Sequence, residues 1–106
     1  MSTRARIGLR YADGRVKSIF LHFDGGPGKM LPRLNDEYGE ARAVELLLAD
    51  GDLKSMGCPA VAQPAAKLSR TVADYLRHAR DCWAEHVYLF DGGCWWHRSL
   101  LTEVMR

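Results

Sequence analysis

The chain of 106 residues lacks the marks of several protein classes. It has no apolar run near the roughly eighteen residues that a membrane span needs, and Glu45 interrupts its densest apolar stretch, residues 44–49. No apolar segment follows the basic N-terminus, so we expect no secretory signal. Three cysteines are too few, and odd in number, for the disulfide framework of a small secreted domain. These absences predict a cytoplasmic protein with no membrane contact.

Neither sign of charge dominates the sequence. Fifteen Lys and Arg stand against thirteen Asp and Glu, a net charge of +2 that is too weak for a nucleic-acid clamp by charge alone. The charge is nevertheless segregated: residues 1–29 carry +4, residues 30–66 carry −3 and residues 67–106 carry +1, which sum to +2. A fold that joins the first two segments would neutralise itself, so this pattern alone does not indicate a charged partner.

The composition that is present, 47% hydrophobic and 26% charged residues, predicts one globular domain over residues 1–106. Residues 5–23 predict a β-hairpin, because aliphatic residues alternate with other side chains on both sides of Asp13-Gly14. The turn sets the pairing of the two strands. A two-residue Asp13-Gly14 turn and a three-residue Ala12-Asp13-Gly14 loop, which ends in a left-handed Gly14, give registers that differ by one residue. We prefer the three-residue loop, which gathers on one face Ile7, Leu9, Ile19, Leu21 and Phe23.

Apolar spacing and turn residues predict the other elements in order. They are a loop at 24–29, at most a short helical turn at 30–34, a helix at about 40–50, a connector at 57–66, a helix from near Pro64 or Ser69 to near Trp83, and strands at 86–90 and 94–98. The predicted fold class is α+β: an antiparallel four-stranded sheet in the order β-β-α-α-β-β, with two helices packed on one face.

The loop after the first hairpin holds one candidate site. The backbone amides of Gly25-Gly-Pro-Gly28 and the Lys29 ammonium could bind a phosphate. A Walker motif is excluded, because Phe23 stands where its first glycine is required and Met30 where its Ser or Thr is required. The simpler interpretation of this segment is a turn that needs unusual backbone angles.

His22 and Asp24 form a second candidate, because residues two apart in a strand point the same way and could converge on one ligand. A His–carboxylate pair could act as a general base or hold a metal, although no nucleophile or third ligand follows from the spacing. The alternative is that Asp24 caps the following turn and His22 lies on the surface.

Four Cys and His side chains near the C-terminus superficially resemble a zinc set: Cys82, His86, Cys94 and His97. Cys94 and His97 are three apart in a predicted strand and therefore point to opposite faces. Cys82 lies on the predicted buried side of a helix end, where a thiol is a small apolar group. We assign no metal, no cofactor and no catalytic residue.

Adjacent Trp95 and Trp96 must face opposite sides of their strand, so one of them would share the outer face of the sheet with Phe20. Nearby Arg10 and His22 would suit a protein interface or stacking on a base. The sequence has no RNA-binding run of the Lys/Arg-Gly-Phe type. The aromatic residues form either a partner surface or a core that the tail of the chain covers.

Three stretches of the N-terminal half resemble a family of small uncharacterised bacteriophage and prophage proteins: Ser2-Thr-Arg-x-Arg-Ile-Gly-Leu9, Asp13-Gly-x-Val-Lys-Ser-Ile19 and His22-Phe-Asp-Gly25. The family carries His-Trp-Asp-Gly at the last of these, then a Gly-Lys loop and a Tyr-led helix ending in Gly-Asp, which Tyr38 and residues 44–52 resemble. The resemblance covers residues 2–57, and this chain departs from it at Phe23 and in a shorter 25–29 loop. It implies a mobile-element origin and a role against the host that is exerted by binding.

The first hypothesis is a non-enzymatic phage-type accessory protein that binds a host protein or protein complex in the host cytoplasm, an inhibitor of a bacterial defence system being one such role. The alternative is a small-ligand or nucleotide-binding protein, or a weak hydrolase, that uses His22, Asp24 and Lys29. Nucleic acid and a second copy of the chain stay open as partners. The residues expected to bind a ligand or partner are His22, Asp24, Lys29, Phe20, Trp95, Trp96 and Arg10.

Overall fold

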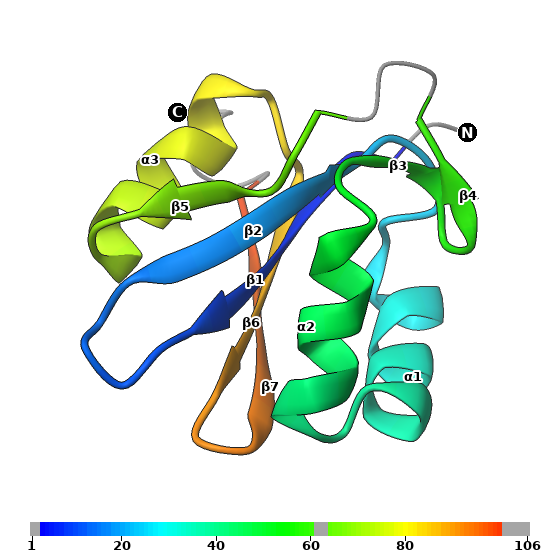
Figure 1. Cartoon of the computed structure of the whole chain (residues 1–106). Coiled ribbons are helices and arrows are strands. Elements are labelled where there is room, and N and C mark those ends of the chain that lie inside the picture. Colours follow the sequence, from blue (N-terminus) through cyan, green and yellow to red (C-terminus); the bar gives the residue numbers. More distant parts are fainter. Residues whose placement is uncertain (1–2, 61–63, 101–106) are drawn as a thin grey trace.

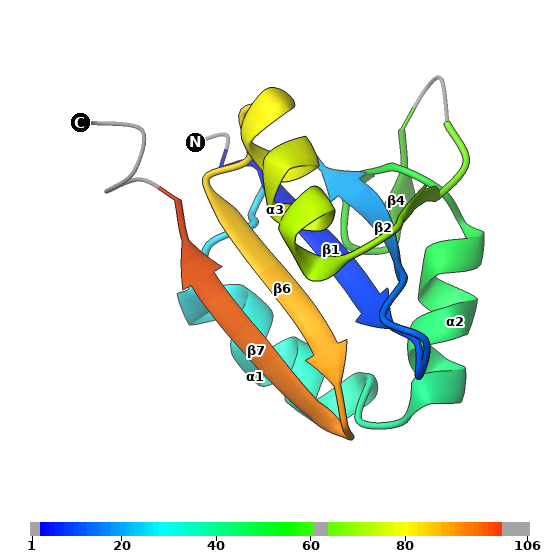
Figure 2. The same cartoon turned by 90° about the vertical axis from the view of Figure 1, so that its left-hand side faces the viewer.

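The computed structural model describes residues 3–60 and 64–100, which form three helices and a seven-stranded sheet. The elements are β1 (Ala5–Arg10), β2 (Val16–Leu21), α1 (Pro27–Glu37), α2 (Ala41–Ala49), β3 (Leu53–Ser55), β4 (Cys58–Pro59), β5 (Lys67–Ser69), α3 (Val72–Asp81), β6 (His86–Asp91) and β7 (Cys94–Ser99). The strand order is β4-β3-β2-β1-β6-β7, and β5 pairs separately with β2. Helices α1 and α2 cover one face of the sheet and α3 covers the other (Figure 1, Figure 2).

The prediction of an antiparallel four-stranded sheet with helices on one face is wrong. The sheet is mixed, because β1 runs parallel to β6 and β2 runs parallel to β3. Both predicted hairpins exist, but they join through the parallel β1–β6 pair, which no local sequence pattern encodes. Strands β3, β4 and β5 have two or three residues each, too few to leave an alternating signal in the sequence.

The first hairpin has the predicted register. Ile7 pairs with Ile19 across a loop that ends in a left-handed Gly14, whose φ is 91°. Four of the five side chains expected on the shared face are buried under α1 and α2, namely Ile7, Leu9, Ile19 and Leu21. The fifth, Phe23, lies beyond the end of β2 and is 40% exposed, so its predicted place in the core is wrong.

Residues 27–29, expected in a loop, instead begin α1. Pro27 occupies the first turn of this helix, where a missing backbone N–H costs no helical hydrogen bond. Pro32, which the sequence places at the start of a short helical turn, lies instead inside the helix. The buried side chains of Met30 and Leu34 pack this helix against the sheet, so tertiary contacts outweigh the local preference for a loop.

The two predicted helices both exist. Helix α2 lies within the range expected near 40–50. Helix α3 begins after Thr71, later than Pro64, because the Thr71 hydroxyl accepts a hydrogen bond from Asp74 N–H at 3.1 Å and caps the first turn. Residues 67–69, which the helix start at Pro64 would include, form β5 instead, so the alternative start near Ser69 is the closer one.

The sheet carries a different kind of packing under α3. Gly8 leaves room for the ring of Tyr75, since a Cβ on Gly8 would lie 3.0 Å from Tyr75 Cζ. The Tyr75 hydroxyl lies 2.9 Å from Arg6 O and 2.7 Å from Tyr88 O, which fixes the helix on the sheet. Burial raises the pKa of this hydroxyl, so it stays protonated as a donor. Arg6 and Ser18 are also buried on this face, which therefore combines polar groups with a small apolar cluster.

Candidate functional site

Trp95 and Trp96 face opposite sides of the sheet, as adjacent strand positions require. Trp95 lies on the face of α1 and α2, where its ring packs against Phe90 at a centroid distance of 5.3 Å. Its indole N–H donates to Tyr38 O at 2.9 Å. Trp95 therefore ties β7 to the core and does not belong to an exposed aromatic patch.

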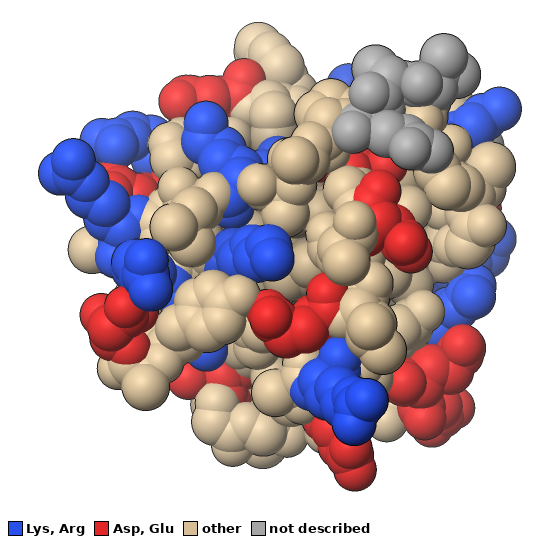
Figure 3. Space-filling model, in the orientation of Figure 1, with Lys and Arg blue, Asp and Glu red and all other residues tan. Residues whose placement is uncertain are grey.

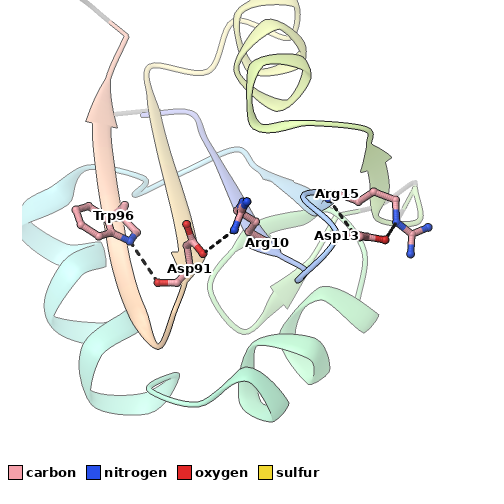
Figure 4. Close-up of polar contacts among 5 residues, drawn as sticks. All are labelled: Arg10, Asp13, Arg15, Asp91 and Trp96. Carbon is pink, nitrogen blue, oxygen red and sulfur yellow. Dashed lines mark hydrogen bonds and ion pairs between the residues drawn. The ribbon is translucent and has the colours of Figure 1, made fainter.

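Trp96 lies on the α3 side of β7 and is 61% exposed. Its indole N–H donates to Asp91 O at 3.3 Å, and the Asp91 carboxylate pairs with Arg10 at 3.3 Å (Figure 4). These contacts link two predicted site residues, Arg10 and Trp96, through the end of β6. A cavity of about 180 Å³ lies beside the ring, with Leu76 of α3 and Leu89 of β6 in its wall.

Phe20 and His22 lie in a different place. Phe20 belongs to β2, which β1 and β6 separate from β7, so it does not join Trp96 in one aromatic surface. The rings of Phe20 and His22 meet edge to face at 4.7 Å. Both line a cavity of about 590 Å³, whose wall also includes Arg6 of β1 and Cys82 at the end of α3.

Asp24 and Lys29 do not converge with His22. The chain turns at Asp24, whose φ is 60°, and the Asp24 carboxylate lies 3.5 Å from Lys29 Nζ. These two side chains line a separate cavity of about 310 Å³ at the start of α1. Gly25 is required for packing, because a Cβ there would lie 2.7 Å from Thr3 O. Gly25 thus allows the backbone to approach Thr3 closely. The unusual backbone angle that was predicted for the glycine-rich turn occurs at Asp24 instead.

Only two of the four Cys and His residues of the suggested zinc set meet. His86 Nδ1 lies 3.0 Å from His97 Nε2, whereas Cys82 directly follows α3 and Cys94 lies at the exposed start of β7. In the described part of the chain, no group of three or more His, Cys, Asp or Glu is placed to hold a metal ion. Burial lowers the pKa of both histidines, and repulsion from a charged His97 lowers the pKa of His86 further.

A hydrogen-bonded Ser–His pair escaped the sequence analysis. Ser69 Oγ lies 2.9 Å from His78 Nδ1, in the wall of a cavity of about 460 Å³ that also includes Lys67 and Arg77. Burial, with the nearby Lys67 and Arg77 charges, lowers the pKa of His78. Ser69 is only 1% exposed, which closes its hydroxyl to a substrate. The pair therefore joins β5 to α3. The sequence alone does not indicate it, because the contact depends on the pairing of β5 with β2.

Arg6 is a third residue that was not predicted from the sequence. It alternates with buried Ile7, so the hairpin pattern placed it among the solvent-facing side chains. It is nevertheless only 7% exposed, because α3 crosses this face of the sheet. A contact between segments so far apart in the chain leaves no signal in the local sequence.

Charged side chains of both signs are mixed over the surface, with Lys and Arg most frequent over β5 and α3 (Figure 3). The basic first segment forms ion pairs with the third segment: Arg4 pairs with Glu85 at 3.2 Å and Arg10 with Asp91 at 3.3 Å. These two ion pairs accompany the parallel β1–β6 pairing; the first and second segments meet as well, because β2 pairs with β3 and the residues of α1 and α2 pack against β1 and β2.

None of the helices in the described residues is long and apolar enough to span a membrane. The resemblance to bacteriophage proteins stays a prediction. Comparison with protein-family models, with curated proteins and with solved structures gave no match.

Proposed function

We propose that this is a binding protein that takes an extended segment of a partner protein onto the free edge of β7. The observation that carries the proposal is an exposed tryptophan, Trp96, on a six-residue edge strand whose outer side pairs with no strand among the described residues. The resemblance to bacteriophage proteins would make the partner a protein of the bacterial host, and a component of a defence system is one candidate.

The two ends of the strand order β4-β3-β2-β1-β6-β7 support this choice of strand. At one edge, β4 has two residues, includes Pro59 and pairs with β3 through a shifted register. Short strands, prolines and bulges all prevent an edge from pairing with another chain. At the other edge, β7 has six residues, no proline and a regular register with β6. No strand in residues 3–60 and 64–100 pairs with the outer side of β7.

The backbone groups that a partner strand would meet can be named. Leu100 N–H donates to Glu85 O at 2.8 Å, and this bond shows which residues of β7 direct their backbone groups to β6. Residues of an antiparallel strand bond alternately to one neighbour and to the other side. The even-numbered residues of β7 therefore bond to β6, while Trp95 and His97 direct their N–H and C=O groups to the free edge.

Trp96 would anchor the partner segment. The Asp91 carbonyl holds the indole N–H, and Arg10 holds the Asp91 carboxylate, so the ring loses little conformational freedom on binding. The adjacent cavity of about 180 Å³, beside Leu76 and Leu89, has room for one apolar side chain of the partner. Strand addition beside an aromatic anchor is a common way of recognising an extended peptide.

Two substitutions of one residue test the strand addition. His97→Ala and His97→Pro both remove the imidazole, but only proline removes the outward N–H. Peptides selected from a random library against the wild-type protein serve as the probe, and fluorescence anisotropy gives their affinity. We expect His97→Ala to keep most of the affinity and His97→Pro to lose about tenfold or more.

The anchor has its own variant. Trp96→Ala should also lose about tenfold or more in affinity for the selected peptides, as expected for a central aromatic residue of an interface. Arg33→Ala, on the exposed side of α1, is the matched control and should change nothing. Unchanged affinity in His97→Pro would contradict strand addition. A dimer in size-exclusion chromatography that His97→Pro dissociates would assign the edge to a second copy of the chain instead.

A further inference from the structure

A buried arginine without a carboxylate partner lies beneath α3. The Arg6 guanidinium donates from Nε to Ser18 Oγ at 2.9 Å and from Nη2 to Ser18 O at 3.4 Å, and its Nη1 lies 3.9 Å from Cys82 Sγ. A guanidinium has more N–H donors than these three contacts use. None of the ion pairs formed among the described residues includes Arg6. A cation that is only 7% exposed normally has an anionic partner, and residues 3–60 and 64–100 supply none.

Arg6 lies in the wall of the cavity of about 590 Å³. This cavity exists because two short strands share the outer edge of β2: β5 pairs with residues 16–18, and β3 pairs at Leu21. Between them the Phe20 N–H is not bonded to a strand and donates instead to Asp52 Oδ1 at 2.8 Å. The sheet is therefore open at this point, and the opening leads to the guanidinium.

The wall of this cavity combines apolar surface with positive charge. Its apolar part consists of Phe20, Phe23, Ala60 and Pro64, its charged basic groups are Arg6 and Lys54, and it also includes the His22 imidazole. The carboxylate of Asp52 in the same wall already accepts the Phe20 N–H. The volume lies within the range of roughly 300–1,000 Å³ that is typical of small-molecule sites. A ligand for this wall needs an anionic group for Arg6 and a flat apolar part for the phenylalanine rings.

We propose that this cavity binds a small organic anion in which a carboxylate or phosphate is attached to an aromatic ring. The anionic group bonds to the free N–H donors of Arg6, and charge-assisted bonds to a guanidinium are among the strongest that a protein makes. The ring packs against the aromatic part of the wall, where His22 lies 4.7 Å from Phe20 and 6.4 Å from Phe23 between ring centroids, and where stacking and edge contacts favour a planar group. This site is independent of the β7 edge, from which β1 and β6 separate it.

Isothermal titration calorimetry of the full chain tests the site with adenosine 5′-monophosphate and 2-naphthoate as ring-bearing anions. Adenosine and 2-naphthamide are their neutral counterparts, and inorganic phosphate lacks the ring. We expect at least one ring-bearing anion to bind about tenfold or more tightly than both its neutral counterpart and phosphate. Binding of the nucleotide alone assigns a phosphate ligand, and binding of the naphthoate alone assigns a carboxylate ligand.

Arg6→Met removes the charge at similar volume and should abolish the preference for the anion over its neutral counterpart. Arg10→Met is the control: it removes an arginine of the same strand that lies outside the cavity, and the preference should stay unchanged. Phe23→Ala shortens a side chain that is 40% exposed, so we expect the variant to fold and to bind the ring-bearing anion several-fold more weakly. The inference is overturned if neither anion binds, or if the neutral counterpart binds as tightly. It also fails if a folded Arg6→Met keeps the preference, or if Phe23→Ala binds the anion unchanged.

Discussion

The face of the sheet under α1 and α2 and the face under α3 are formed by the same strands but are covered to different extents. Two helices and a continuous set of buried apolar side chains close the first face. One helix covers the second face, where Arg6, Ser18 and Ser69 are buried beside a smaller apolar cluster. Both proposed binding surfaces lie on the second face, one beside Trp96 and one beside Phe20.

The difference follows from alternation along the strands. Ile7 and Tyr88 point into the closed face, while their neighbours Arg6 and Val87 point toward α3. The closed face fixes the register of the strands and buries most of the apolar side chains. The fold is therefore stable although polar groups and cavities lie on the other face. A single helix on a sheet leaves the strands on both of its sides open, and those are the places where a ligand or a partner can reach the sheet.

Truncating one leucine on each face tests this division most directly. Leu48 of α2 is fully buried on the closed face, and Leu48→Ala should lower the free energy of unfolding by about 2–5 kcal/mol. Leu89 is half-buried on the α3 face, and Leu89→Ala should cost about 1 kcal/mol. Urea unfolding followed by circular dichroism measures both. Equal losses would show that the two faces contribute alike to stability.

Gly8 tests how tightly α3 lies on its face. A Cβ at Gly8 would meet Val16 Cγ1 at 2.9 Å and Tyr75 Cζ at 3.0 Å, and neither group can move freely. Gly8→Ala should therefore lower the free energy of unfolding by about 1–3 kcal/mol. Gly28→Ala is the control, because nothing lies within 4 Å of its Cβ and alanine is the better helix former, by up to about 1 kcal/mol. Similar stability of Gly8→Ala and wild type would mean that α3 is loosely packed.

The sequence predicted what depends on neighbouring residues. The register of the first hairpin follows from one left-handed residue, Gly14, and from the need to bury Ile7 and Ile19 together. The helices near 40–50 and 72–81 follow from apolar spacing. The placing of Trp95 and Trp96 on opposite faces follows from strand geometry, although the sequence could not tell which of them would be exposed.

The rest depends on contacts between distant segments. The parallel pairing of β1 with β6 joins residues about eighty positions apart, unites the two hairpins in one mixed sheet and brings Arg10 to Asp91. The packing of Met30 and Leu34 makes a helix of a segment rich in glycine and proline. The crossing of α3 buries Arg6, which any local pattern assigns to solvent. Both proposed surfaces include residues brought together in this way.

The smallest expected effect concerns the histidine pair at the rim of the closed face. Because folding lowers the pKa of His86 and His97, the folded state favours their neutral forms. This contribution is complete above the unfolded pKa of about 6.5, and it is lost as the pH falls below that value, since the unfolded chain then binds more protons. The thermal midpoint should therefore decrease from pH 8 to pH 5. His97→Gln keeps a hydrogen-bonding partner for His86 but removes one of the two charges, so its midpoint should decrease less. If the midpoint of His97→Gln decreases as much as that of the wild type, the acid sensitivity arises elsewhere. His78 on the α3 face is then the next residue to substitute, since its pKa is also lowered.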